Sequence, residues 1–159
     1  MLPIGDVVPN PRNPNQHGDK QLRLLAKIIR KQGWRAPITI SKRSGLVVTG
    51  HGRLAAAKIL GLREVPVDYQ SFASDAEEWA HMVADNRIAE LADLRIPALK
   101  DLLIEMDSGD FDMDLTGFEE SDIETLMQEV QAKTNRAPEA EAEKKCPKCG
   151  LVFVVEATK

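Results

Sequence analysis

The strongest constraint in this sequence is a β-branched run that turns through two glycines directly into an alanine-rich stretch, over residues 47–57. Val47, Val48 and Thr49 favour a short strand, and the alanines after Leu54 favour a helix. A chain that changes from strand to helix within a few residues needs a tight turn, and glycine supplies the backbone freedom for it. The pattern therefore predicts a strand–turn–helix unit.

The turn has the composition of an anion site. Gly50 and Gly52 let the backbone approach a ligand without an intervening Cβ. The following helix presents free N–H groups and the positive end of its dipole, and Arg53 adds a planar cationic fork that matches phosphate oxygens. His51 lies where it can contact a ligand or act as general acid or base, although a structural role is the alternative. Glycines that merely shape a turn are the alternative explanation of the whole pattern.

The pattern of residues 1–90 predicts a small α+β domain. Apolar residues at 3.6-residue spacing indicate helices, and short β-branched runs between turns indicate strands. In chain order we expect a strand, a helix, two strands, a helix, a strand and a helix, at residues 4–8, 19–33, 37–40, 46–49, 54–60, 65–69 and 75–86. This order suits a small mixed β-sheet with packed helices.

Length and composition indicate a compact cytoplasmic protein. Its 159 residues, 43% of them hydrophobic, suffice for one folded domain with appendages. No run approaches the roughly 18–20 apolar residues of a membrane span, and no secretion signal is present, so we expect no membrane partner. Residues 1–100 hold 15 Lys and Arg against 10 Asp and Glu, whereas residues 101–159 hold 6 against 15. Only the first part is suited to face a polyanion, unless these charges merely solvate the surface.

Three further regions differ from the core of residues 1–90. Residues 91–131 are acidic with two amphipathic stripes, which indicate a helical extension that covers the domain or a partner. Residues 132–145 have the Ala/Glu/Lys/Pro composition of a flexible linker. Residues 146–159 open with Cys-Pro-Lys-Cys-Gly and form what we expect to be a C-terminal zinc-knuckle-like tail.

The tail supplies only half of a zinc site. Cys146 and Cys149 have the C-x-x-C-G spacing that directs two thiolates at one metal, whereas a structural Zn²⁺ takes four ligands. Two chains would together provide four thiolates, which predicts a homodimer joined through Zn²⁺. A redox pair and an unoccupied remnant are the alternatives.

The order of motifs in residues 1–90 resembles the ParB/sulfiredoxin family. The matching segments lie in the same sequence as in that family, and they are Val-Pro-Asn-Pro at 8–11, Gly-Trp-Arg-Ala-Pro-Ile at 33–38, Thr-Gly-His-Gly-Arg-Leu-Ala-Ala at 49–56, Gly-Leu-Arg-Glu-Val-Pro-Val at 61–67 and Asp-Asn-Arg at 85–87. Several motifs in a consistent order are more specific than any one of them. The resemblance implies the ParB/sulfiredoxin-like fold.

The resemblance also implies a nucleotide site. In ParB proteins the corresponding turn grips the triphosphate of CTP, which implies that Gly50, His51, Gly52 and Arg53 surround phosphate. The family's acid-Asn segment helps hold Mg²⁺, which implies a metal contact at Asn86 and its neighbour Asp85, and a further phosphate contact at Arg87. The cofactor implied is Mg²⁺ with a nucleoside triphosphate.

Departures from the family pattern weaken this pocket. His51 replaces an acid, and Gly52 and Ala55 replace two arginines, so we expect weak or no hydrolysis. His51 also stands where sulfiredoxins carry their reactive cysteine, which excludes that activity.

A later segment, residues 115–123, resembles the region after the ParB-like domain in phage and bacterial proteins where this module precedes an adenine-specific DNA methyltransferase. The methyltransferase's own Pro-Pro motif is absent from the sequence. We therefore expect a nucleotide- or DNA-binding module in phage, plasmid or bacterial DNA metabolism. Its expected partners are nucleotide, DNA and a DNA methyltransferase or another phage or plasmid protein. The alternatives are a phosphoryl-transfer enzyme (nuclease or small-molecule kinase), a regulatory partner of a DNA methyltransferase, and a structural adaptor.

Overall fold

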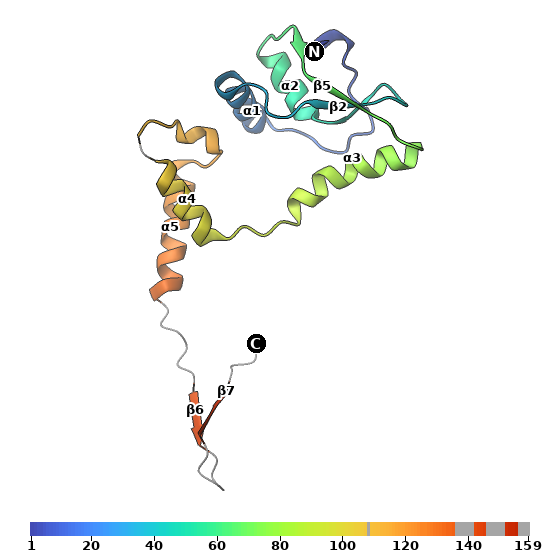
Figure 1. Cartoon of the computed structure of the whole chain (residues 1–159). Helices are drawn as coiled ribbons and strands as arrows, with labels where there is room; N and C mark the ends of the chain where they lie inside the picture. The colour runs from blue at the N-terminus through green and yellow to red at the C-terminus, as the bar shows by residue number, and fades with distance from the viewer. Residues whose placement is uncertain (108, 136–141, 146–151, 156–159) are drawn as a thin grey trace. The chain divides into compact units, whose positions relative to one another are not determined.

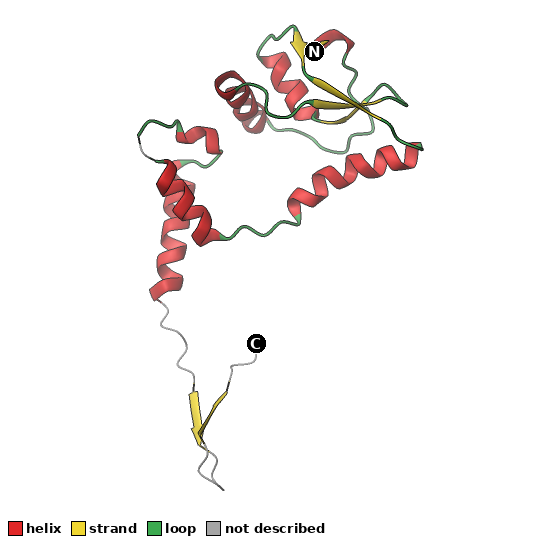
Figure 2. Cartoon of the chain, viewed as in Figure 1, coloured by secondary structure: helices red, strands yellow, loops and turns green. Residues whose placement is uncertain are grey.

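The computed structural model describes residues 1–107, 109–135, 142–145 and 152–155 (Figure 1). Its contacts divide the chain into two units, each described by itself. The first comprises Met1–Leu94 with Asp114–Gly117, and the second comprises Arg95–Met113 with Phe118–Lys159. Strands and helices alternate in the first unit, whereas helices dominate the second (Figure 2).

A mixed three-stranded sheet lies at the centre of the first unit, in the order β3-β2-β5. The middle strand β2 (Ile38–Ser41) pairs antiparallel with β3 (Val47–Thr49) and parallel with β5 (Val67–Gln70). All four residues of β2 are buried, as expected of a central strand covered on both faces. Two shorter strands, β1 (Leu2–Pro3) and β4 (Glu64–Val65), pair antiparallel with each other.

Three helices complete the first unit: α1 (Asp19–Gln32), α2 (His51–Ile59) and α3 (Asp75–Glu90). Helix α1 ends at Gly33, whose φ of 75° is the left-handed conformation that glycine adopts easily. Helix α3 begins at Ser74, whose side chain accepts a hydrogen bond from the N–H of Glu77.

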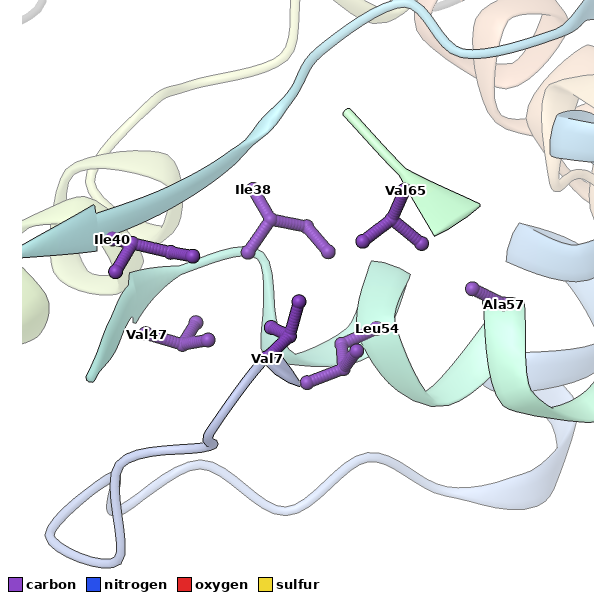
Figure 3. Packing of buried hydrophobic residues seen from close by; sticks show 7 residues of the cluster. All are labelled: Val7, Ile38, Ile40, Val47, Leu54, Ala57 and Val65. Atoms are coloured by element: carbon purple, nitrogen blue, oxygen red, sulfur yellow. The ribbon is translucent and has the colours of Figure 1, made fainter. Parts of the chain in front are cut away.

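The hydrophobic core fixes the beginning of α2 against the sheet. The buried residues are drawn from five elements or loops, and they are Val7, Ile38, Ile40, Val47, Leu54, Ala57 and Val65 (Figure 3). Full burial of a side chain such as Leu54 contributes about 1.5–3 kcal/mol. A second buried cluster joins Ala56 of α2 to Ala26 and Ile29 of α1. Small alanine side chains leave room for the two helices to approach, so α2 is held on both sides.

The structure differs from the sequence-based expectation mainly at element ends. The first strand is shorter and earlier, because the chain enters a 3₁₀ turn η1 (Ile4–Asp6) and then forms only a single bridge, from Val8 to Leu46. The expected strand at 65–69 is interrupted at Pro66, which has no N–H to donate to a ladder. Helix α2 begins three residues earlier than expected, so the motif glycine Gly52 lies inside its first turn.

The second unit contains the acidic helices that the sequence predicts. Helix α4 (Ile96–Met106) packs against α5 (Glu120–Asn135), and Leu103 is buried. The 3₁₀ turn η2 (Met113–Thr116) precedes α5 in the chain, but its residues 114–116 belong to the first unit. In the second unit β6 (Ala142–Lys145) pairs antiparallel with β7 (Val152–Val155). Cys146 and Cys149 lie outside the described residues. In the part of the chain that the structure describes, no helix has the length and apolar character required to span a membrane.

Candidate functional site

The glycine turn forms the N-terminus of α2, as the sequence predicts. Gly50 is the N-cap residue with φ 93° and ψ 21°, in the left-handed region. A Cβ at this position would lie 3.3 Å from the Cα of the buried Ile38, so both the conformation and the space favour glycine. The first intrahelical bond of α2 runs from the N–H of Leu54 to the C=O of Gly50 (2.9 Å). The N–H groups before Leu54 therefore lie at the positive end of the helix.

A pocket of about 210 Å³ opens at this helix end. It brings six of the predicted site residues together, from the start of α2 and from the second half of α3: Gly50, His51, Gly52, Arg53, Asp85 and Asn86. The predicted residues 50–53 and 85–86 are more than thirty positions apart in sequence, and the packing of α3 beside β3 brings them together.

Arg87 does not line this pocket. Its guanidinium Nη1 lies 2.7 Å from Glu90 Oε2 on the same helix, and the side chain borders an adjacent hollow with Pro14 and Val83. Asn86 lines both this pocket and the adjacent hollow, whereas Arg87, about 100° further around the helix, lines only the hollow.

His51 is half-buried and hydrogen-bonded. Its Nε2 accepts the backbone N–H of Asn10 at 3.2 Å, which requires that Nε2 carry no proton. Burial lowers the pKa of His51 below its ordinary value of 6.5, and the nearby His17 lowers it further. The imidazole is therefore neutral at physiological pH, with its proton on Nδ1 by this assignment. A neutral ring donates a weaker hydrogen bond to an anion than a charged one.

His17 belongs to the site although the sequence analysis did not select it. Its ring lies against the turn, since a Cβ on Gly52 would come 3.1 Å from His17 Cε1 and 3.1 Å from Leu25 Cδ1. The ring is oriented by its Nδ1, which lies 3.0 Å from Gln21 Oε1 one helical turn onward. Asn13 and Asn15 also line the pocket. The high Pro and Asn content of residues 9–15 is the one sequence feature that indicates a contribution of this segment to the site. Such a segment runs over the surface and offers several polar groups.

The oxygen atoms of α3 fit a hard cation. The Asn86 Nδ2 donates to the C=O of Met82 at 3.0 Å, so the amide oxygen is the atom that can contact a metal. The exposed Asp85 carboxylate lies beside it in the same pocket. Mg²⁺ is commonly bound by one or two such oxygens together with substrate phosphates. Within the described residues no three His, Cys, Asp or Glu side chains gather as a metal site, so phosphate oxygens would have to complete the coordination.

Comparisons with known proteins match both parts of this chain to ParB-related families. The family model of the ParB N-terminal domain matches residues 1–87, and that of the ParB-methyltransferase HTH domain matches residues 97–148. The ParB-like nuclease domain-containing protein YnaK of Escherichia coli is 32% identical over 76 residues, which are 48% of this chain and 86% of that protein. A ParB-like protein of Sulfolobus acidocaldarius is 32% identical over 81 residues, covering 47% of this chain and 41% of the other.

Among solved structures, the truncated chromosome-partitioning protein ParB of Caulobacter crescentus in complex with CTP-γ-S has the same fold. It superimposes with a TM-score of 0.62 and 23% identity, over 82% of this chain and 81% of that one. The fold and the glycine-rich helix N-terminus define a small α+β domain of the ParB N-terminal type. Because the matching family model spans more than half of its residues, this chain belongs to the ParB-like family. The second match, to the ParB-methyltransferase HTH domain, is a similarity that covers about a third of the chain and includes α5 and all but the first residue of α4.

Proposed function

We propose that this protein is a nucleotide-binding module of the ParB type, which holds the phosphates of a nucleoside triphosphate, CTP foremost, with Mg²⁺. The pocket at the N-terminus of α2 carries the proposal, because it gathers Gly50, His51, Gly52 and Arg53 opposite Asp85 and Asn86. The module would act in phage, plasmid or bacterial DNA metabolism. The CTP-γ-S complex of the Caulobacter protein supports CTP as the first ligand to test.

The electrostatics of the pocket support an anionic ligand. A helix N-terminus carries roughly half a positive charge, and the first turn of α2 contains no acidic residue to oppose it. Arg53 adds a full positive charge at the same place. Asp85 is the single carboxylate in the lining, which would repel phosphate unless Mg²⁺ bridges the two. The proposed role of Mg²⁺ is therefore to join Asp85 and Asn86 to the phosphates.

The same lining supports weak or no hydrolysis. His51 is a weak candidate for a general base, because burial lowers its pKa and because its unprotonated nitrogen, Nε2, already accepts the N–H of Asn10. We expect the bound nucleotide to be retained rather than turned over. Release of inorganic phosphate from CTP, ATP or GTP at enzymatic rates would instead favour a phosphoryl-transfer enzyme.

Titration calorimetry with CTP, ATP and GTP, each with and without Mg²⁺, tests the site. Loss of a charge-assisted hydrogen bond costs about 1.5–3 kcal/mol, so Arg53→Ala should weaken binding by about ten- to a hundredfold. Lys58→Ala is the matched control, because it removes one positive charge from the opposite end of the same helix. Equal losses in both variants would mean that net charge, rather than the turn, attracts the nucleotide.

The helix-turn-helix match at residues 97–148 favours a second function, which we propose as regulation of a DNA methyltransferase. Residues 101–159 hold 15 acids against 6 bases, a balance that repels DNA and suits contact with a basic protein surface. Fluorescence anisotropy with duplex DNA at about 50 and 200 mM salt tests the alternative. Affinity that falls steeply with salt would show phosphate contacts and favour DNA binding over a protein partner.

A further inference from the structure

A second pocket, of about 190 Å³, lies at the N-terminal end of α3 and shares no lining residue with the first. It is formed by the loop after η1, by the turn between β2 and β3, and by the first turns of α3. This volume is below the roughly 300–1,000 Å³ of pockets for drug-sized ligands, so the pocket suits a small group such as one planar ring. The lining residues that matter are Asn10, Arg12, Ser44, Glu78 and Trp79.

Two buried side chains in this lining each have one satisfied and one unsatisfied polar atom. Glu78 is 2% exposed, and its Oε1 accepts the hydroxyl of Ser44 at 2.8 Å. Asn10 is 4% exposed, and its Oδ1 accepts the N–H of Arg12 at 2.9 Å. Glu78 Oε2 and Asn10 Nδ2 have no hydrogen-bond partner among the described residues. Buried polar atoms are nearly always paired, because each unmade bond costs about 1–3 kcal/mol.

The nature of the two atoms restricts what can pair with them. Asn10 Nδ2 is a donor and needs an acceptor, whereas the Glu78 carboxylate oxygen is an acceptor and needs a donor. A metal cation would face the N–H groups of Asn10 and the guanidinium of Arg12, and an anion would face Glu78. A neutral group with a donor beside an acceptor satisfies both atoms at once. Lactam and amidine edges, as in the nucleobases, have this arrangement.

The rest of the pocket offers flat surfaces. The guanidinium carbon of Arg12 lies 4.3 Å from the ring centroid of Trp79, a cation–π contact between two planar groups of the lining. Unpaired bases stack on aromatic rings and on guanidinium planes. Both the unpaired polar atoms and the planar lining groups therefore favour a planar heterocycle as the ligand.

We propose that the pocket around Asn10 and Glu78 binds one nucleobase through its donor–acceptor edge. The base comes either from a free nucleoside or from an unpaired nucleotide of single-stranded DNA. This proposal does not rest on the phosphate site proposed at α2. Of the two pockets, Asn10 lines only the second, and its backbone N–H donates to His51 of the first.

The test uses the full chain and deoxynucleosides without phosphate, so that the first pocket is not engaged. The reporter is the indole N–H NMR signal of Trp79, assigned with Trp79→Phe. We expect saturable shifts with thymidine, which has N3–H beside O4, and at least tenfold weaker binding of N3-methylthymidine, which lacks that donor. Failure of all four deoxynucleosides to produce saturable shifts, or equal binding of the methylated ligand, overturns the proposal.

Two variants locate the binding. Glu78→Gln should weaken binding of the tightest-binding deoxynucleoside at least tenfold. The unfolding midpoint of this variant in urea should stay close to that of the unsubstituted chain. Arg53→Ala should leave deoxynucleoside affinity unchanged, which separates this site from the proposed phosphate site. A thymidine octamer distinguishes the sources: tighter binding than thymidine supports single-stranded DNA, and equal binding per base supports a free nucleoside. Unchanged affinity in Glu78→Gln would refute this location, whatever the result for the nucleotide titrations.

Discussion

The two pockets of the first unit are built in different ways. The proposed phosphate pocket, at the N-terminus of α2, takes four of its residues from one continuous turn, Gly50 to Arg53. Much of the chemistry proposed for it comes from backbone N–H groups of that turn. The second pocket takes Asn10, Ser44 and Glu78 from three separate segments, and its chemistry comes entirely from side chains.

This difference decides which site a sequence can reveal. A helix N-terminus with glycines and an arginine has a local pattern, so a candidate site is indicated by eleven consecutive residues. Glu78 has no such context, because a glutamate near a helix N-terminus is ordinarily a solvated first-turn acid. Its burial becomes apparent only when the turn between β2 and β3 places Ser44 against it.

One glycine near each pocket allows a direct test, and it carries the largest expected effect. Gly50 and Gly45 have φ of 93° and 74°, so alanine at either position costs about 1–2 kcal/mol for the left-handed backbone. A Cβ at Gly50 would also press on Ile38, whereas one at Gly45 meets nothing within 4 Å. We expect Gly50→Ala to lower the free energy of unfolding by about 2–4 kcal/mol, and Gly45→Ala by about 1–2 kcal/mol.

Urea unfolding measures both values. Equal losses would show that the phosphate turn has room for a side chain, and that only backbone conformation requires glycine there. The turns at Gly50 and Gly45 would then tolerate an alanine side chain equally well.

The sequence predicts the fold where local patterns decide it. The order of elements through α3 and the mixed sheet with packed helices follow from periodicity and turns, and six of the seven predicted residues of the phosphate site line one pocket. The ends of elements differ from the prediction because they depend on single residues. Pro66 divides the predicted strand into β4 and β5, and α2 already begins at His51, within the glycine turn. The position of Arg87 shows the limit, because a motif is read along the chain whereas a helix distributes its side chains around an axis.

His17 shows a second limit. Thirty-five residues separate it from Gly52, and its relevance depends on how closely α1 packs against the beginning of α2. Such a distance depends on the alanines between the helices, a property of tertiary packing that no pattern in the loop encodes.

The Ser44–Glu78 hydrogen bond provides the next prediction, of intermediate size. Ser44→Ala removes the partner of Glu78 Oε1, so that neither oxygen of the buried carboxylate has a side-chain partner among the described residues. It should lower the free energy of unfolding by about 1–3 kcal/mol. In Glu78→Gln the same serine change should cost less, because a neutral amide is less costly to bury. A double-mutant cycle with the two changes should therefore give a coupling energy of about 0.5–3 kcal/mol. Strict additivity would mean that the bond contributes nothing to the second pocket.

The smallest expected effect concerns His51. It tests whether this ring of the first pocket is buried, as Glu78 of the second pocket is. Because burial lowers the pKa of His51 in the folded chain, the unfolded chain binds a proton first as the pH falls. The contribution of His51 is therefore fully present above its unfolded pKa of about 6.5, and it is lost as the pH falls through the lower folded pKa. Its slope cannot exceed about 1.4 kcal/mol per pH unit. We expect His51→Gln to remove this part of the pH dependence of unfolding as the pH falls below about 6.5. His81→Gln, a change to an exposed histidine whose ring lies tilted near that of Phe72, should retain it. An unchanged slope in His51→Gln would place the ring in solvent, and would reverse the expectation that a neutral imidazole limits how strongly this pocket holds phosphate.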